Sequence, residues 1–323
     1  MGRTLSNEHI ELLPKAPSKW LYPIYVPSYT RAGVAPFLNL LAEAPRTIRD
    51  KVHVIVRREE LDDYRVAYPW AKFAVVKLPG LGPARMRALR DADRRGYRRI
   101  LMVDDDIRAV SLLQCTVNPK GERYAKRYSP SVSGLTAVEN MYRTLAVTCK
   151  VTEGIFKLRP HVSYGAVRNA LFSGPVADPD VAGQVFKQSF PSCVMIFDLE
   201  RFPIRRLPRE FHFYGEDLAM FLANITSGGE SFQMPCVAYD QSVALETTIP
   251  LDPTDSVGRR VDMDNAGVHY PSMRPYLRES VRNKAGGVMR IGINWKRWNA
   301  DTGNTQTEIP LTAALAASKK ESK

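Results

Sequence analysis

Short apolar runs alternate with helix-like segments along the first hundred residues. The apolar runs lie at 22–26, 51–56, 73–76 and 99–103. Their length and their content of valine and isoleucine are typical of buried β-strands. Between them, 36–43 and 83–95 show the spacing of amphipathic helices. This alternation predicts an α/β fold with a mostly parallel central sheet that is flanked by helices.

The rest of the chain shows fewer clear elements. Apolar runs at 192–197 and 231–239 predict two further strands, and 133–147 and 215–224 predict two helices. The segment 163–172 fits either a strand or a loop. No internal repeat is visible, so the sequence does not predict a repeat architecture.

Composition divides the chain into four parts. We expect the polar residues 1–19 to be a flexible N-terminal segment, and the small and charged residues 312–323 to be a disordered tail. Residues 20–250 hold the predicted strands and helices and form the expected main domain. Residues 251–311 are loop-like and rich in arginine and aromatic residues, and we expect them to pack on the main domain as a basic C-terminal extension.

The composition and several absent motifs exclude some classes of protein. No stretch approaches the roughly 20 apolar residues that cross a bilayer, and residues 1–19 lack the apolar core of a signal peptide, so we expect no membrane partner and no export. The four cysteines form no Cys-x-x-Cys pair, which argues against a zinc site and for reduced thiols in the cytoplasm. A Gly-x-x-x-x-Gly-Lys phosphate loop and a Gly-x-Ser-x-Gly nucleophile elbow are also absent.

The chain carries an excess of positive charge. It has 46 Lys and Arg residues against 34 Asp and Glu residues, which gives a net charge of +12. There are 31 arginines and 15 lysines, and the arginine fork binds phosphate oxygens bidentately. This bias favours a phosphate-rich partner, with nucleic acid as the leading candidate. A basic surface that only keeps the protein soluble is the alternative.

Three consecutive aspartates follow the apolar run at 99–103. A strand at this point would deliver Asp104, Asp105 and Asp106 to the carboxyl edge of the sheet, where α/β proteins bind ligands. Adjacent carboxylates repel one another, and a hard divalent cation such as Mg²⁺ or Mn²⁺ offsets that repulsion. Asp104 and Asp106 are two positions apart, and we expect them to project to the same side. The alternative is an exposed acidic turn without a ligand.

A second acidic pair, Glu216 and Asp217, opens the predicted helix at 215–224. A carboxylate close to a metal-bound phosphate ester could act as a general base toward an attacking hydroxyl group. Asp217 is the preferred candidate for this catalytic role, and Glu216 is the second. Acidic residues in the first turn of a helix also interact favourably with the helix dipole, so a capping role is the alternative.

Arginines and aromatic residues are interleaved near the second acidic pair and in the C-terminal segment. The arginines could hold nucleic-acid phosphates, and the rings could stack on unpaired bases. The candidate nucleic-acid-binding residues are Arg205, Arg206, Arg274, Arg278, Arg282, Trp295 and Arg297. The alternative is a solvated basic face with the tryptophans packed in the core.

The order of these motifs resembles that of GT-A glycosyltransferases. The motifs are Val26-Pro-Ser-Tyr-Thr-Arg31, Pro83-Ala-Arg85, Asp104-Asp-Asp106 and Gly215-Glu-Asp217, and the resemblance spans residues 20–245. The Pro-Ser-Tyr-x-Arg start and the triple aspartate are similar to the TET-associated glycosyltransferases of bacteriophages, which are thought to glycosylate hydroxymethylated DNA bases. The resemblance implies a GT-A-like catalytic domain at 20–250 and, for a phage-encoded protein, a place in the host cytoplasm.

The resemblance also implies how a nucleotide sugar, with a UDP-sugar as the first choice, would be bound. The implied donor-binding residues are Pro27, Ser28, Tyr29, Arg31, Arg57, Arg85 and Asp105. Those at the end of the first strand would hold the nucleobase and ribose, and Arg57 would contribute to the same pocket. Arg85 would meet the diphosphate or the sugar, although Met86 follows it where many relatives carry asparagine. Asp105 would lie near the ribose or the sugar.

For the cation, the resemblance implies Asp104 and Asp106 as ligands and a late histidine as a third, for which His269 is the candidate. Asp217 would be the base if the enzyme inverts the configuration of the sugar. Mn²⁺ or Mg²⁺, together with an arginine aimed at the β-phosphate, would stabilise the charge that develops as the sugar–diphosphate bond breaks.

The sequence therefore predicts a metal-dependent glycosyltransferase that moves a sugar from a nucleotide sugar to a hydroxymethylated base, such as hydroxymethylcytosine, in phage DNA. A protein, lipid or polysaccharide acceptor, a nucleotidyltransferase reaction and a DNA-binding protein without enzymatic activity are the alternatives. A phosphatase of the haloacid dehalogenase type, which also places Asp-x-Asp after a strand, fits less well because Ile107 and Arg108 follow the aspartates.

Overall fold

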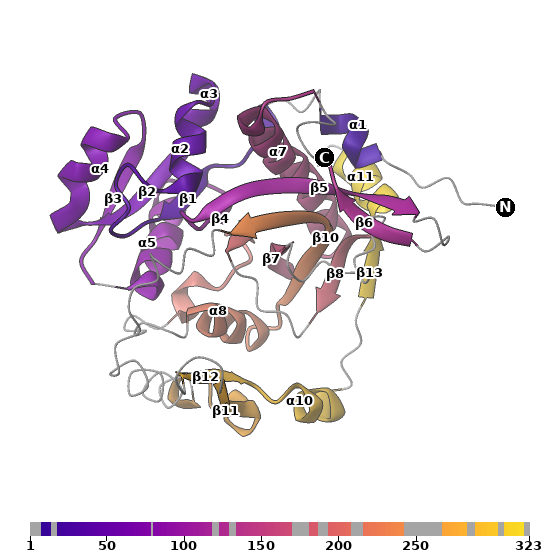
Figure 1. Cartoon of the computed structure of the whole chain (residues 1–323). Helices are drawn as coiled ribbons and strands as arrows, with labels where there is room; N and C mark the ends of the chain where they lie inside the picture. Colours follow the sequence, from indigo (N-terminus) through magenta and orange to yellow (C-terminus); the bar gives the residue numbers. More distant parts are fainter. Residues whose placement is uncertain are drawn as a thin grey trace.

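A mixed sheet of eleven strands runs through the molecule, with helices on both of its faces (Figure 1). The structure is a computed structural model. It describes residues 8–13, 18–78, 80–117, 123–128, 134–169, 181–186, 193–207, 216–241, 267–282, 288–302 and 307–319. The α/β class that the sequence predicts is confirmed.

The first four strands are parallel, as the alternation of strand and helix predicts. They are β1 (Ile24–Pro27), β2 (Val52–Arg57), β3 (Lys72–Val76) and β4 (Arg99–Val103). Ile24 of β1 is aligned with Val52 of β2 and with Leu101 of β4. The helices between them are α2 (Pro36–Ala42), α3 (Arg46–Arg49), α4 (Leu61–Ala67) and α5 (Leu81–Arg94), with the short 3-10 helix η3 (Arg58–Glu60) before α4.

The remaining strands make the sheet mixed rather than mostly parallel. They are β5 (Ile107–Val117), β6 (Arg123–Arg127), β7 (Val162–Asn169), β8 (Val181–Phe186), β9 (Val194–Asp198), β10 (Glu230–Gln241) and β13 (Thr307–Pro310). β7 and β10 are parallel, whereas β9 runs antiparallel to both β4 and β7. The strand order is β13-β8-β10-β7-β9-β4-β1-β2-β3, and β5 joins β6 to β10. Hydrophobic periodicity marks a segment as a strand but not its direction, which explains the difference.

Two apolar cores lie on opposite faces of the sheet. On β1, Ile24 and Val26 belong to one core and Tyr25 to the other, because successive side chains of a strand point to opposite faces. The first core includes residues of α2 and of α7 (Ala137–Leu158), whose first turn is closed by a capping box. The second core includes residues of α5 and of α8 (Glu216–Ile225). Asp104 and Asp217 therefore stand on elements that the cores hold in place.

A C-terminal group of elements lies beside α8 (Figure 1). It consists of η6 (Pro271–Tyr276), a separate two-stranded sheet of β11 (Leu277–Arg282) and β12 (Val288–Ile293), and α10 (Trp295–Thr302). Ile293 and Trp298 are buried in the second core, and the Trp295 ring meets Phe221 of α8 edge-on at 5.6 Å. The group is therefore attached to the helix that begins with the second acidic pair.

The prediction of a disordered tail from residue 312 is wrong for 312–319. This segment belongs to α11 (Leu311–Lys319), in which Leu311, Ala314 and Leu315 are buried. Helix α11 packs so closely on α7 that a Cβ atom on Gly154 would lie 1.8 Å from the Ala314 carbonyl oxygen. Small side chains let the two helices approach, and composition alone does not reveal that contact.

The N-terminal segment is likewise more ordered than predicted. α1 (Glu8–Leu12) and the 3-10 helix η2 (Ser18–Trp20) lie within it, and Ile10 and Leu13 are buried in the first core. Among the helices of the described ranges, none has both the length and the apolar character needed to cross a membrane.

Candidate active site

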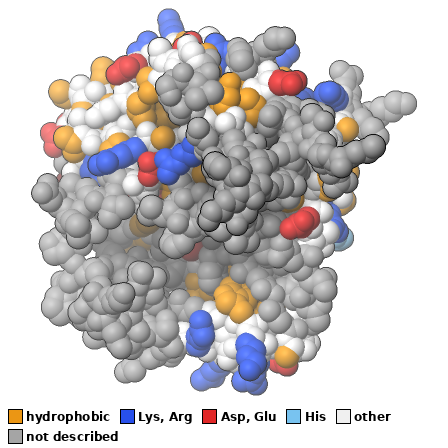
Figure 2. Space-filling model, turned by 45° about the vertical axis from the view of Figure 1, so that its right-hand side comes forward, with side chains coloured by type: hydrophobic (Ala, Val, Ile, Leu, Met, Phe, Trp, Pro, Cys, Tyr) orange, Lys and Arg blue, Asp and Glu red, His pale blue; other side chains and the backbone are white. Residues whose placement is uncertain are grey.

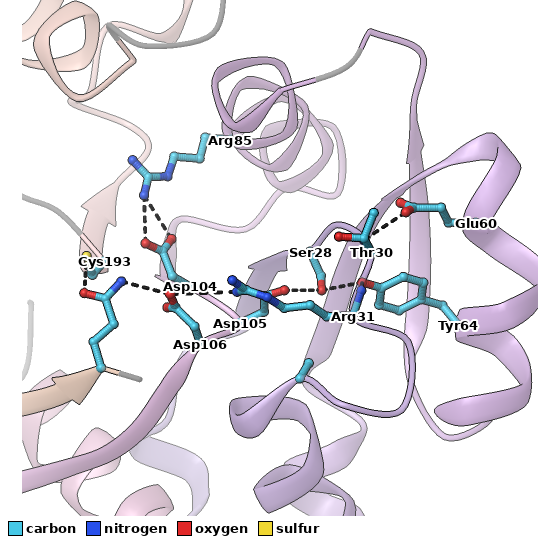
Figure 3. A network of polar contacts seen from close by, with 12 residues as sticks. Ser28, Thr30, Arg31, Glu60, Tyr64, Arg85, Asp104, Asp105, Asp106 and Cys193 are labelled. Atoms are coloured by element: carbon cyan, nitrogen blue, oxygen red, sulfur yellow. Dashed lines mark hydrogen bonds and ion pairs between the residues drawn. The ribbon is translucent and has the colours of Figure 1, made fainter. Parts of the chain in front are cut away.

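The three aspartates lie in the turn between β4 and β5, at the carboxyl edge of the parallel strands (Figure 3). Asp104 and Asp105 are only 8% and 6% exposed. The Asp104 N–H donates to the Cys193 carbonyl oxygen at 2.8 Å, and the Asp105 carbonyl oxygen accepts from the Phe37 N–H at 3.1 Å. Backbone hydrogen bonds to two other elements therefore fix the turn on both sides.

Arg85 of α5 joins the two acidic motifs. Its side chain is 2% exposed, and its Nη2 lies 2.9 Å from both carboxylate oxygens of Asp104 (Figure 3). Its Nη1 donates to Oδ1 of Asp217, the second residue of α8. A planar guanidinium can serve two carboxylates at once, which a lysine ammonium does less well. The motifs at 104–106 and 216–217 thus belong to one site.

Asp217 has the properties of a candidate general base. Loss of hydration raises the pKa of its carboxyl group and the Asp104 carboxylate raises it further, while Arg85 opposes both effects. One third of the Asp217 side chain is exposed, so a hydroxyl group can approach it. A raised pKa makes a carboxylate a better proton acceptor near neutral pH.

Asp105 faces the end of β1. Its Oδ2 accepts a hydrogen bond from the Ser28 hydroxyl at 2.5 Å, and its Oδ1 forms an ion pair with Arg31 (Figure 3). Ser28 also hydrogen-bonds to the Tyr64 hydroxyl at 2.7 Å, and the Tyr64 oxygen accepts from the Arg31 N–H at 3.0 Å. Burial raises the pKa of Asp105 to about 6, although Arg31 and Ser28 favour the charged form.

One carboxylate oxygen of Asp106 accepts a hydrogen bond, and the other is buried without a hydrogen-bond partner among the described residues. Oδ2 accepts from Gln241 Nε2 at 3.0 Å and lies 3.8 Å from Arg31 Nη1. Oδ1 is buried and has no hydrogen-bond partner among the residues that the structure describes. Burial raises the pKa of Asp106, and Gln241 opposes that rise. An unpartnered buried carboxylate oxygen suits a hard divalent cation, so the residues present fit Mn²⁺ or Mg²⁺ at this point.

Tyr29 and Arg57 form the outer rim of the site. The Arg57 guanidinium lies over the Tyr29 ring at 4.1 Å from its centroid, and 37% of Tyr29 is exposed. Glu60 accepts a hydrogen bond from the Thr30 N–H at 2.8 Å, which ties this rim to the start of α4 (Figure 3). Pro27 pairs with Ile55 at the end of β1. An exposed ring next to a cation can stack on a nucleobase.

The predicted third metal ligand is not assembled with the aspartates. His269 is exposed, and its ring contacts Tyr270. The Tyr270 hydroxyl donates to the Arg206 carbonyl oxygen at 3.0 Å and lies 3.5 Å from the carbonyl oxygen of Ala219 on α8. In the described ranges no group of three or more His, Cys, Asp or Glu side chains is placed to hold a metal. The set of Asp104, Asp106 and His269 as cation ligands stays a prediction. In the described ranges, Asp104 is engaged by Arg85, and Oδ1 of Asp106 is a buried oxygen without a hydrogen-bond partner.

The candidate nucleic-acid-binding residues differ in their surroundings. Arg205, Arg206, Arg274, Arg278 and Arg297 are exposed. Figure 2 shows Lys and Arg side chains gathered at the lower end of one face, where β11, β12 and α10 lie in Figure 1. Trp295 is half-buried and packs edge-on against Phe221. The side chains of Arg282 and Glu216 lie outside the described residues.

Several residues of the site have no recognisable signal in the sequence. Tyr64 lies on α4, Cys193 precedes β9 and Gln241 ends β10. These three residues come close to the acidic turn, or to residues that contact it, only because distant strands and helices pack together. Single polar residues of these types occur throughout the chain, so spacing alone could not select them.

The fold and the site together define an α/β enzyme with an acidic, arginine-bridged centre at the edge of a parallel sheet. The family model described as TET-Associated Glycosyltransferase matches residues 22–203, more than half of the chain. The chain therefore belongs to the TET-associated glycosyltransferase family and is a nucleotide-sugar glycosyltransferase. None of the curated proteins matches it.

Solved structures resemble the chain only distantly. Glucosyl-3-phosphoglycerate synthase from Mycobacterium tuberculosis, in complex with Mn²⁺ and uridine diphosphate, is 12% identical with a TM-score of 0.44, and the match covers 96% of this chain and 94% of that one. TarS from S. aureus, residues 1–349, is 14% identical with a TM-score of 0.42, over 77% of this chain and 65% of that one. At these TM-scores the resemblance assigns no activity.

Proposed function

We propose that this glycosyltransferase transfers a sugar from a nucleotide sugar, with UDP-sugars as the first class to test, to a hydroxymethylated base in DNA, and that it requires Mn²⁺ or Mg²⁺. The observation that carries the proposal is the bridge from Asp104 through Arg85 to Asp217. Through this bridge, one guanidinium contacts both Asp104, where we expect the sugar donor, and Asp217, where we expect the acceptor.

The donor would lie along the edge formed by β1, β2 and the acidic turn. Tyr29 and Arg57 offer a ring and a cation at the rim for the nucleobase. Ser28, Arg31 and Asp105 form the hydrogen-bonded cluster next to it, where a ribose would reach them. Oδ1 of Asp106, which is buried and has no hydrogen-bond partner among the described residues, is the atom at which a cation would meet the diphosphate.

In the reaction, the acceptor hydroxyl oxygen forms a bond to the anomeric carbon while the bond from that carbon to the diphosphate oxygen breaks. Asp217 takes the proton of the hydroxyl group, and the nucleoside diphosphate leaves with the bonding electron pair. A divalent cation held at Asp106 would supply positive charge next to the diphosphate. Arg85 keeps Asp217 charged and in place, since its guanidinium favours the carboxylate form.

DNA as the acceptor rests on charge. The net charge is +12, and Arg274, Arg278 and Arg297 are exposed on the C-terminal group beside α8. A duplex held by its phosphates at this surface would lie beside α8, the helix that begins with the second acidic pair. A base in a duplex must be flipped out before its hydroxymethyl group can reach Asp217.

The test is a transfer assay with MnCl₂, a panel of nucleotide sugars and DNA with or without 5-hydroxymethylcytosine. Digested nucleosides are then weighed by mass spectrometry. We expect one donor to add a hexose mass to the hydroxymethylated nucleoside and to release a nucleoside diphosphate. Transfer to a protein, lipid or polysaccharide with no effect of DNA would reject the proposed acceptor, and release of pyrophosphate would indicate a nucleotidyltransferase.

A further inference from the structure

The amide group of Gln241 is fixed from both of its ends. Its Nε2 donates to Asp106 Oδ2 at 3.0 Å, and its Oε1 lies 3.9 Å from the Cys193 sulfur. A carboxylate only accepts hydrogen bonds, so the amide nitrogen has to face Asp106. The amide oxygen then faces the thiol, which can donate a weak hydrogen bond to it. The chain of contacts therefore has one consistent direction, from Cys193 to Gln241 to Asp106.

A change of register brings Gln241 to this position. On β10, Asp240 is aligned with Ala109 of β5, but Gln241 is aligned with Ile107, so that Arg108 is passed over. Such an irregularity places an extra residue in one strand and re-aims the neighbouring side chains. Regular pairing would have set Gln241 opposite Arg108. The shift sets it instead next to Asp106.

The backbone at Cys193 is held in an unusual conformation at the same point. Its φ angle is +62°, in the left-handed region that residues other than glycine rarely adopt. Such a residue costs about 1–3 kcal/mol and persists where its surroundings fix it. The Cys193 carbonyl oxygen accepts from the Asp104 N–H at 2.8 Å, and the Tyr239 hydroxyl hydrogen-bonds to the thiol. Cys193 thus contacts the acidic turn through its backbone and Gln241 through its side chain.

We propose that Gln241, supported by Cys193, is a positioning residue that turns Asp106 so that Oδ1 is presented to a divalent cation. The inference rests on the proposed function, which requires that cation. Gln241 occupies Oδ2, and the other oxygen is left buried and without a partner among the described residues. Without the amide, either oxygen could turn toward Arg31, whose Nη1 already lies 3.8 Å from Oδ2. Groups that orient a metal ligand typically change metal affinity by about 10- to 100-fold.

The experiment measures Mn²⁺ binding directly, with the signal of free Mn²⁺ in electron paramagnetic resonance and MnCl₂ as the probe, alone and with UDP. Gln241→Met keeps the length of the side chain and removes the donor. We expect it to weaken Mn²⁺ binding about 10- to 100-fold. Gln233→Met, the same substitution on the same strand, is the matched control and should bind Mn²⁺ as the wild type does.

A second pair of variants tests the thiol. Cys193→Ser keeps a hydrogen-bond donor at this position, whereas Cys193→Ala removes it. We expect the serine variant to bind Mn²⁺ more tightly than the alanine variant. Both keep a Cβ atom at the positive φ angle, so the backbone strain is the same in the two proteins. Equal affinities would overturn the part of the inference that concerns Cys193.

The outcomes separate this inference from the proposed function. Wild-type binding that is abolished in Asp106→Asn and weakened in Gln241→Met supports both. If Gln241→Met is folded, with an unchanged melting temperature, and binds Mn²⁺ as tightly as the wild type, the positioning role is overturned and the cation site stands. If the wild type binds no Mn²⁺ with or without UDP, the cation requirement and the inference both fall.

Discussion

Arg85 and Asp217 are hydrogen-bonded to one another although 132 positions separate them in the chain. Arg85 lies on α5, the last helix before the acidic turn, and Asp217 lies at the start of α8. The same guanidinium holds Asp104 with Nη2 at 2.9 Å from both of its oxygens. At the centre of the site, Asp104 and Asp217 therefore share the positive charge of the Arg85 guanidinium. Substitutions at any of these three residues should affect the other two.

Arg85→Lys should slow transfer and move its pH dependence. A lysine ammonium is a point charge and cannot hold both carboxylates in a planar fork, so the Asp217 carboxylate loses part of its stabilisation. The pKa of Asp217 should rise further, and the acid limb of the kcat profile should move to higher pH. We expect kcat to fall about 10- to 100-fold at pH 7, because a misplaced base loses much of the general-base contribution. A profile that keeps its acid limb would contradict the role given to Arg85.

Asp217→Asn should separate donor binding from chemistry. Asparagine has nearly the same shape but cannot take a proton, so kcat should fall about 10²- to 10⁴-fold. The affinity for UDP should stay within a few-fold of the wild type, since the donor is assigned to the other side of Arg85. Single-turnover kinetics and UDP titration check the two quantities. A parallel loss of UDP binding would show that Asp217 has a structural role at the start of α8.

Exposed arginines of the C-terminal group should contribute to DNA binding through phosphates. Arg274→Gln and Arg278→Gln should each raise the KM for hydroxymethylated DNA and leave the KM for the nucleotide sugar unchanged. The salt dependence of DNA binding should weaken by about one counterion for each variant. Arg46→Gln, at an 85% exposed arginine on α3, is the control and should change neither quantity. Unchanged DNA binding in both test variants would place the acceptor surface elsewhere.

His53 should make the protein less stable in acid. It is 1% exposed, and its ring stacks on Tyr25 at 4.7 Å. Burial, with Arg95 and Lys72 nearby, lowers the pKa of His53 from 6.5 to about 4. The folded protein then binds this proton less readily than the unfolded chain, so stability is present above pH 6.5 and is lost as the pH falls toward 4.

The difference between the pKa values of His53 in the unfolded and folded protein gives the size of this loss of stability. A fall from 6.5 to about 4 corresponds to about 3 kcal/mol of unfolding free energy. His53→Phe keeps the stacked ring but cannot bind the proton. Between pH 7 and pH 4, the unfolding free energy of this variant should therefore fall less than that of the wild type, by about the amount just given. Urea unfolding at the two pH values measures the difference. Equal losses in the two proteins would refute the assignment.

The sequence predicts the parts of the structure that depend on local pattern. The strands from β1 to β4 follow from short apolar runs, and Asp104–Asp106 and Asp217 follow from their places at the end of a strand and the start of a helix. The directions of β9 and the later strands do not follow, because pairing between distant segments decides them. The local pattern does not indicate helix α11, because its small residues are stabilised by close contact with Gly154 of α7, which lies far away in the sequence.

The residues of the functional site also divide into those that the sequence indicates and those that only the pairing of distant segments brings together. The resemblance points to Arg85, Ser28 and Arg31, and each of the three contacts an aspartate of the acidic turn. His269 follows from the resemblance, as a late histidine, and in the described ranges it belongs to no group of three side chains placed to hold a metal. Gln241 meets Asp106 only because the register of β10 shifts, and a register shift leaves no mark in hydrophobic periodicity.

The central claim is that the acidic turn holds a nucleoside diphosphate through a divalent cation at Asp106. Isothermal titration of UDP into the protein, with and without MnCl₂, tests it most directly. We expect Mn²⁺ to strengthen UDP binding at least 10-fold in the wild type and to have no effect in Asp106→Asn, because a cation bound next to the diphosphate neutralises charge that the aspartates repel. UDP affinity that is the same with and without Mn²⁺ in the wild type would contradict the claim.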